Sequence, residues 1–87
     1  MKMNNKQRKT LEAVFKVPTP SNIKYNELIS MLKSLDVKIK ESSSGSRILL
    51  TFRGHTQVIH KPHPQSEIKQ YAIRIIKEFL ISTGVKL

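Results

Sequence analysis

The chain has three histidines, His55, His60 and His63, which lie close together in the segment HTQVIHKPHP. Imidazole has an unperturbed pKa of about 6.5, so it can bind metals and move protons under ordinary conditions. The cluster can therefore hold a metal ion, transfer protons during chemistry on a phosphate, or simply lie on the surface. The direction of each ring decides among these interpretations, and the surrounding secondary structure sets that direction.

A β-hairpin is predicted around the first two histidines. The segments RILLTF (47–52) and TQVIH (56–60) read as strands. Arg53-Gly54 between them is typical of a two-residue turn, because glycine accepts a positive φ. In that register, opposed residues share one face of the sheet. The predicted pairs are Phe52 with His55, Thr51 with Thr56, Leu50 with Gln57, Leu49 with Val58, Ile48 with Ile59, and Arg47 with His60.

This register separates a buried face from an open one. The residues expected to face the helices are Ile48, Leu50, Phe52 and Ile59. Those expected to face away are Arg47, Leu49, Thr51, Thr56, Val58 and His60. A loop with an odd number of residues would turn the third strand over, because side chains alternate along a strand. Leu49 and Val58 are apolar yet outward, which burial by a partner, a shift in register or a second covering element would each explain.

A metal centre that uses all three rings is not expected. His55 lies at the hairpin tip, about 15 Å along the strand from His60 if the hairpin is regular. His63 lies beyond the strand between two prolines, which hold its backbone extended. Glu41 is the only acid expected nearby, and two histidines without a carboxylate make a poor zinc site. We therefore expect neither a metal nor another cofactor.

Arg47 and His60 suit chemistry on a phosphate. A guanidinium beside an imidazole can stabilise the charge of a transferring phosphoryl group while the imidazole moves a proton. In RNA the neighbouring 2′-hydroxyl can be the attacking group, which requires no metal. The alternative is an ordinary cross-strand surface pair. The basic side chains expected to dock RNA near this pair are Lys38, Lys40, Arg53 and Lys61.

Apolar residues at helical spacing predict three helices, over residues 6–15, 25–35 and 66–84. Asn4 or Asn5 can cap the first helix, Ser66 is expected to cap the last, and Gly84 to end it. The stripe of the last helix expected to be buried contains Ile68, Tyr71, Ala72, Ile75, Ile76, Phe79 and Leu80.

The predicted element order defines a fold class. Val37 and Ile39 alternate with Lys38 and Lys40, which predicts a half-buried first strand. Residues 1–20 are expected to form an N-terminal helix and a proline-containing connector, and residues 21–87 an α-β-β-β-α domain. The expected fold is α+β and resembles a double-stranded-RNA-binding domain. Its three-stranded antiparallel sheet has helices packed on one face, and the N-terminal helix is additional.

The composition bounds the class of protein. The chain of 87 residues has no cysteine, and 38% of its residues are hydrophobic, which suits one small domain without disulfides. Sixteen Lys and Arg against 6 Asp and Glu give a net charge of +10, which favours a polyanionic partner, nucleic acid above all. No apolar run reaches membrane length, and MKMNNKQRK has no apolar stretch after its charges. We expect a cytoplasmic monomer with neither a secretory signal nor a membrane contact.

Several segments, taken in order, resemble the HicA toxin family of small basic ribonucleases from toxin–antitoxin pairs. They are the helix NIKYNELISMLKSL, the loop with Gly45-Ser46, the strand hairpin, Pro62-His63-Pro64, and the closing helix that ends in Thr83-Gly84-Val85. The resemblance covers roughly residues 24–87, and the arm from RKTLEAVF to VPTP resembles one subgroup. It implies a double-stranded-RNA-binding-like fold, metal-independent cleavage of mRNA, and an acidic HicB-like antitoxin that covers the active face.

The chain departs from the family at one catalytic position. Many members have a histidine after the Gly-Ser pair, whereas Arg47 follows it here. Arginine stays protonated and cannot act as a general base. Either His60 carries the chemistry with Arg47, and His63 assists at the edge of the site, or the chain binds RNA without cutting it. His63 can equally cap backbone near the helix start. A third possibility is a basic domain that meets only an acidic protein.

Overall fold

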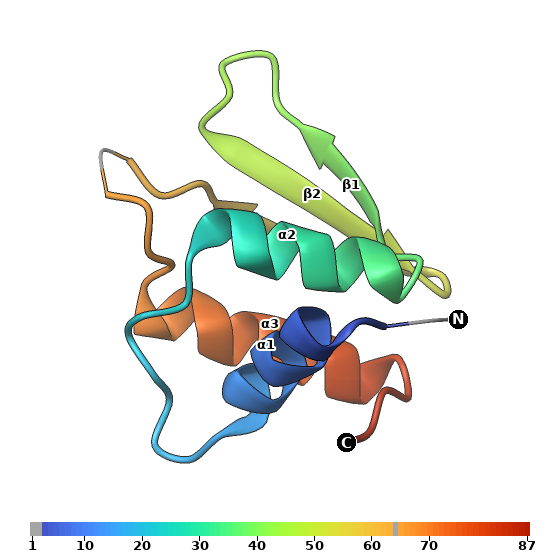
Figure 1. Cartoon of the computed structure of the whole chain (residues 1–87). Helices are drawn as coiled ribbons and strands as arrows, with labels where there is room; N and C mark the ends of the chain where they lie inside the picture. The colour runs from blue at the N-terminus through green and yellow to red at the C-terminus, as the bar shows by residue number, and fades with distance from the viewer. Residues whose placement is uncertain (1–2, 64) are drawn as a thin grey trace.

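The computed structural model describes residues 3–63 and 65–87 as three helices and a three-stranded antiparallel sheet, which confirms the predicted α+β class. The elements are α1 (Asn5–Phe15), α2 (Tyr25–Ser34), β1 (Lys38–Glu41), β2 (Arg47–Phe52), β3 (His55–His60) and α3 (Gln70–Ser82). The strand order is β1-β2-β3. Helix α2 contacts β1 and α3 contacts β3, so these two helices cover one face of the sheet. Helix α1 packs against both of them, and Figure 1 shows α2 between α1 and the sheet.

The hairpin has the predicted register at all six pairs, from Phe52–His55 to Arg47–His60. Both turn residues adopt a positive φ, 49° at Arg53 and 81° at Gly54, as a two-residue type I′ turn requires. This turn matches the right-handed twist of the flanking strands, so short-range turn chemistry fixes the register of the whole hairpin. Strand β1 pairs with the other edge of β2.

One hydrophobic core lies between the sheet and the helices. The four strand residues predicted to face the helices are all buried, and Leu11 and Val14 of α1 belong to the same cluster. Residues of the cluster with at most 1% exposure include Val14, Leu28, Met31, Leu32, Ile48, Leu50, Ile68, Ile73, Ile76 and Leu80. The N-terminal helix is therefore part of the packed structure and helps to hold α2 in place beneath the sheet.

The last helix begins at Gln70, so the predicted start at Ser66 is wrong. The residues before it pair with the chain that enters α2. The Tyr25 N–H donates to the Ser66 carbonyl at 2.8 Å, and the Ile68 N–H donates to the Ile23 carbonyl at 2.8 Å. This short antiparallel bridge satisfies backbone groups in an extended conformation, and it replaces the first helical turn that the local sequence favours.

The buried face of α3 also differs from the predicted stripe in three places. Ile73 is completely buried although it was not expected to be, whereas Tyr71 is 46% exposed and Ile75 is only half-buried. Tyr71 lies on the same side of the helix as half-buried Ile75 and exposed Glu78, at spacings of four and seven residues. This flank lies at the edge of the core, where only Ile75 packs against it, and α3 fills the core itself through Ala72, Ile73, Ile76, Phe79 and Leu80.

Helix α1 is capped by Asn4, one of the two predicted residues. The Asn4 side chain accepts a hydrogen bond from the Gln7 N–H at 2.7 Å, and the Gln7 side chain accepts one from the Asn4 N–H at 2.9 Å. This reciprocal capping box satisfies two backbone donors at the start of the helix. In the described part of the chain, no helix has both the length and the apolar character needed to cross a lipid bilayer.

Arg53 ties the hairpin tip to the end of α3. Its Nη1 donates a 2.8 Å hydrogen bond to the carbonyl of Thr83, the C-cap residue, and its guanidinium carbon lies 4.7 Å from the centre of the Phe52 ring. The bond satisfies one of the carbonyls that a helix end leaves unpaired. Arg53 therefore stabilises the packing of the hairpin on α3.

Substitution of Arg53 by alanine is expected to lower the free energy of unfolding by about 1 kcal/mol, because a charge-assisted hydrogen bond and a cation–π contact are both lost. Alanine tolerates the positive φ no better than arginine, so the difference reports the side chain. Urea denaturation of the variant measures it, with the exposed α1 residue substitution Arg8→Ala as the control. Equal midpoints for the two variants would contradict this role of Arg53.

Candidate functional site

The face of the sheet turned away from the helices carries three parallel rows of side chains. The rows follow from the pairing of the strands and from the 2.9 Å hydrogen bond between the Ser42 N–H and the Arg47 carbonyl. They are Lys38–Thr51–Thr56 nearest the hairpin tip, Lys40–Leu49–Val58 in the middle, and Ser42–Arg47–His60 at the far end. This open face therefore combines lysines, an apolar strip and the Arg47–His60 pair, as the predicted register requires.

Arg47 and His60 are direct cross-strand neighbours, and both side chains are exposed. The next pair along the ladder is hydrogen-bonded, since the Lys61 N–H donates to the Ser46 carbonyl at 3.0 Å. Because the two kinds of pair alternate, Arg47 and His60 form a non-hydrogen-bonded pair, whose Cα atoms approach to about 4.5 Å and whose side chains lie close together. The two groups can thus act on one bound phosphate.

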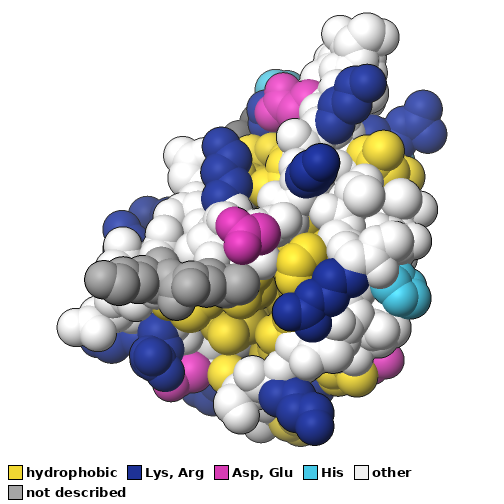
Figure 2. Space-filling model, turned by 90° about the vertical axis from the view of Figure 1, so that its right-hand side faces the viewer, with side chains coloured by type: hydrophobic (Ala, Val, Ile, Leu, Met, Phe, Trp, Pro, Cys, Tyr) yellow, Lys and Arg dark blue, Asp and Glu magenta, His cyan; other side chains and the backbone are white. Residues whose placement is uncertain are grey.

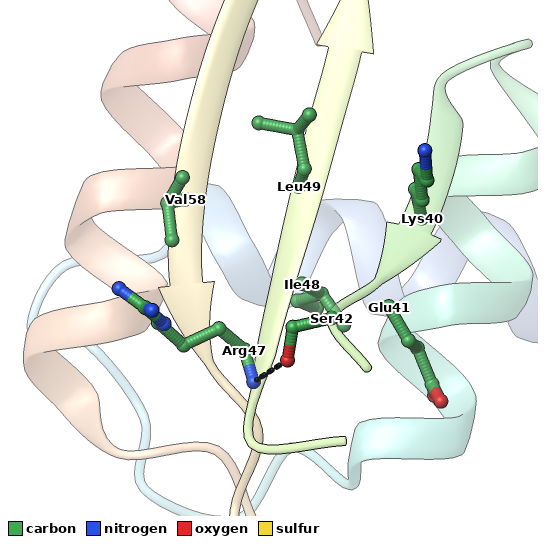
Figure 3. A pocket seen from close by; sticks show the side chains of 7 residues that line it. All are labelled: Lys40, Glu41, Ser42, Arg47, Ile48, Leu49 and Val58. Carbon is green, nitrogen blue, oxygen red and sulfur yellow. Dashed lines mark hydrogen bonds between the residues drawn. The ribbon is translucent and has the colours of Figure 1, made fainter. Parts of the chain in front are cut away.

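A hollow of about 310 Å³ lies in the open face beside this pair. Its lining residues are Lys40, Glu41, Ser42, Arg47, Ile48, Leu49 and Val58. Figure 3 shows Val58, Leu49 and Lys40 side by side on the three strands, with the Arg47 guanidinium reaching past Val58 on the β3 side. The Ser42 Oγ accepts a 3.2 Å hydrogen bond from the Arg47 N–H, which fixes the start of β2 at the edge of the hollow (Figure 3).

His63 lines a different hollow, at the end of the sheet where β3 leaves it. This second hollow, of about 320 Å³, is lined by Ser44, Gly45, Ser46, Lys61, Pro62 and His63, and it shares no residue with the first. The hydroxyls of the serine loop form a chain, with 3.2 Å between Ser42 and Ser44 and 2.8 Å between Ser44 and Ser46. His63 therefore faces the Gly45-Ser46 loop and lies apart from the hollow beside Arg47.

Lys61, which follows β3, contacts Glu41 and the ring of Tyr25. Its Nζ lies 3.1 Å from the Glu41 Oε2 and 5.3 Å from the centre of the Tyr25 ring. The hydrogen bond that Lys61 donates to Glu41, together with the negative charge of Glu41, raises the pKa of Lys61 above its usual value. Burial, opposed by the charge of Lys61, raises the pKa of Tyr25, whose hydroxyl donates to the same Oε2 at 3.5 Å. The Lys61 ammonium has three N–H donors, so it can contact a phosphate while it keeps its bond to Glu41.

The structure brings only part of the predicted site together. Arg47, His60, Lys38 and Lys40 share the open face, and the two lysines are exposed. Arg53 lies at the opposite end of the hairpin and is bonded to Thr83. In residues 3–63 and 65–87, no three histidine or acidic side chains are grouped closely enough to hold a metal ion.

Two features of the site had no clear signal in the sequence. Ser42 extends the row of Arg47 and His60, although it lies after the end of β1 and no residue pattern predicts its pairing with Arg47. The cluster of Tyr25, Glu41 and Lys61 joins three segments of the chain. Tyr25 lies 16 residues before Glu41, and Lys61 lies 20 residues after it. Only the tertiary fold brings these side chains together.

Basic side chains also cover other parts of the surface. Figure 2, a quarter turn from the view of Figure 1, shows Lys and Arg side chains spread over a whole face, with few acidic side chains among them and apolar surface between. With a net charge of +10, this distribution attracts a polyanion from many directions, and the local chemistry of the open face must provide specificity.

No family of known proteins, no curated protein and no solved structure matches this chain. The resemblance to HicA toxins therefore stays a prediction from the sequence. Function is inferred from the side chains of the open face and from the arrangement of the elements that carry them.

Proposed function

We propose that this chain is a HicA-like endoribonuclease toxin, which binds mRNA on the open face of its sheet and cleaves it without a metal ion. The observation that carries the proposal is the exposed, directly paired Arg47 and His60. The order of α2, the three strands and α3 is that of a double-stranded-RNA-binding domain, which adds support. The function places the protein in the cytoplasm, where an acidic HicB-like antitoxin is the partner that keeps it inactive.

The chemistry needs one base and one cation at the scissile phosphate. His60 accepts the proton of the 2′-hydroxyl, and the resulting oxygen attacks the adjacent phosphorus. The bond from phosphorus to the 5′-oxygen of the next nucleotide breaks, and that oxygen takes a proton from solvent. The products are a 2′,3′-cyclic phosphate and a 5′-hydroxyl. Arg47 stabilises the negative charge that builds up on the phosphoryl oxygens in the transition state.

The other predicted residues take supporting roles in binding. Lys38 and Lys40 lie on the open face between the Arg47–His60 pair and the hairpin tip, and they hold RNA phosphates on that side of the scissile one. His63, at the separate hollow beside Gly45 and Ser46, contacts the RNA where the strand leaves the sheet. Lys61 joins them through the N–H donors of its ammonium that Glu41 does not use.

A second candidate function is binding of RNA without cleavage. Arg47 favours it, because arginine follows the Gly-Ser pair at a position where a histidine would be able to act as a base. The same rows of the open face would then hold RNA through phosphate contacts alone. The two candidates share a binding surface and differ only in whether His60 transfers a proton.

Wild-type protein incubated with a long single-stranded RNA in EDTA is expected to cleave it, and the new ends are expected to carry 5′-hydroxyls. A denaturing gel detects the fragments, and phosphorylation by a polynucleotide kinase without prior phosphatase treatment identifies the ends. Binding without cleavage would favour the second candidate. Absence of both at low salt would contradict any RNA-directed function and leave an acidic protein as the partner.

A further inference from the structure

The middle row of the open face forms an apolar floor. Val58 is 47% exposed and Leu49 is half-buried, and the two are paired directly across the sheet. Single exposed apolar side chains are common on protein surfaces and need no explanation. These two are adjacent and line the same hollow of about 310 Å³, so a bound molecule that enters the hollow lies against both of them.

Cations stand at both ends of this floor. Lys40 closes the row on the β1 side, and the Arg47 guanidinium extends past Val58 on the β3 side (Figure 3). An occupant that fits has an apolar surface that lies on the floor and negative charge at its edges. A nucleotide has this combination, because the flat face of its base is joined to phosphates on both sides. A carboxylate-rich protein surface would satisfy the cations and leave the apolar floor without a matching group.

The hollow is large enough for one base. Its volume is at the lower end of the range for small-molecule pockets, roughly 300–1,000 Å³. The row of Arg47 and His60 lies two residues further along the strands, about 7 Å away. A base on the floor therefore places a phosphate of its own nucleotide within reach of Arg47.

We infer that Leu49 and Val58 form a seat for one unstacked base of a single-stranded RNA, next to the phosphate held by Arg47. The inference rests on the proposed function and adds the residues that position the cleaved strand. A base inside a duplex stays stacked between its neighbours and cannot lie on the floor. Fully paired RNA therefore binds through phosphate contacts alone.

Fluorescence anisotropy with three short probes tests the seat. The probes are a single-stranded RNA, a strand of the same length without bases, and the corresponding duplex, all with 2′-O-methyl groups that prevent cleavage. The wild type is expected to bind the first probe roughly five-fold more tightly than the other two, the low end of the gain for a base stacked on an aromatic side chain, because the floor is aliphatic. Val58→Thr and Leu49→Thr are expected to remove most of this preference, and threonine is a β-branched residue that suits a strand at both positions.

The matched control is Thr56→Val, which adds an apolar group on the same face but outside the hollow, and it should retain the preference. Thermal unfolding by circular dichroism shows that each variant is folded. Equal wild-type affinity for strands with and without bases would overturn the seat and leave RNA binding in place. A preference that survives in both floor variants would also overturn it, because the base would then be bound elsewhere on the protein. Absence of binding to every probe would overturn the proposed function together with the seat.

Discussion

Replacement of His60 by alanine is expected to lower the rate of RNA cleavage by roughly 10²- to 10⁴-fold, the range for loss of a general acid–base residue. His60 is exposed at the end of β3 and packs on no part of the core, so the variant should keep its fold. RNA affinity should change by less than about two-fold, because the cations that hold the phosphates remain. Single-turnover cleavage of a labelled RNA in EDTA, with anisotropy measured in parallel, separates the two effects.

His55→Ala is the matched control for this experiment. His55 is also an exposed histidine of β3, but it lies at the hairpin tip, five residues from His60 along the strand. The control should cleave RNA at the wild-type rate. If the cleavage rate fell equally in the two variants, the cause would be a general effect of removing an imidazole. A wild-type cleavage rate in His60→Ala would exclude His60 as the proton acceptor.

The placement of His60 beside Arg47 was predictable because it depends on local chemistry. A two-residue turn with glycine in second position admits few backbone conformations, and the register then follows by counting along both strands. The alternation of apolar and basic residues in β1 likewise oriented Lys38 and Lys40 toward the open face. In each case the information lies within a few residues of the feature that it determines.

Features that depend on distant segments were not predictable in the same way. Ser66 resembles a helix cap, but its carbonyl accepts a hydrogen bond from Tyr25, some 40 residues earlier, and the helix begins at Gln70 instead. Arg53 was assigned to RNA binding from its charge alone, whereas the end of α3 lies close enough to take its guanidinium as a cap. A side chain's charge can be read from the sequence, but its partner depends on which elements the fold brings together.

Substitution of Arg47 by alanine is expected to lower the cleavage rate by roughly 10²- to 10³-fold, comparable to removal of one donor that stabilises a developing oxyanion. Arg47→Lys should bind RNA nearly as well as the wild type, because the positive charge is kept. Its cleavage rate should still fall, since an ammonium lacks the planar pair of donors that a guanidinium presents to a phosphate. Comparing RNA affinity with single-turnover rates for the two variants separates charge from geometry.

Arg47→His tests more sharply whether Arg47 takes part in cleavage or has silenced it. If Arg47 and His60 form the site, a histidine at position 47 removes the permanent charge, and cleavage should fall nearly as far as in Arg47→Ala. If arginine has instead silenced a nuclease that would use a histidine here, the same substitution should increase cleavage above the wild-type rate. The double variant Arg47→His, His60→Ala then identifies the base, because only a histidine that has taken over proton transfer at position 47 would keep its activity without His60.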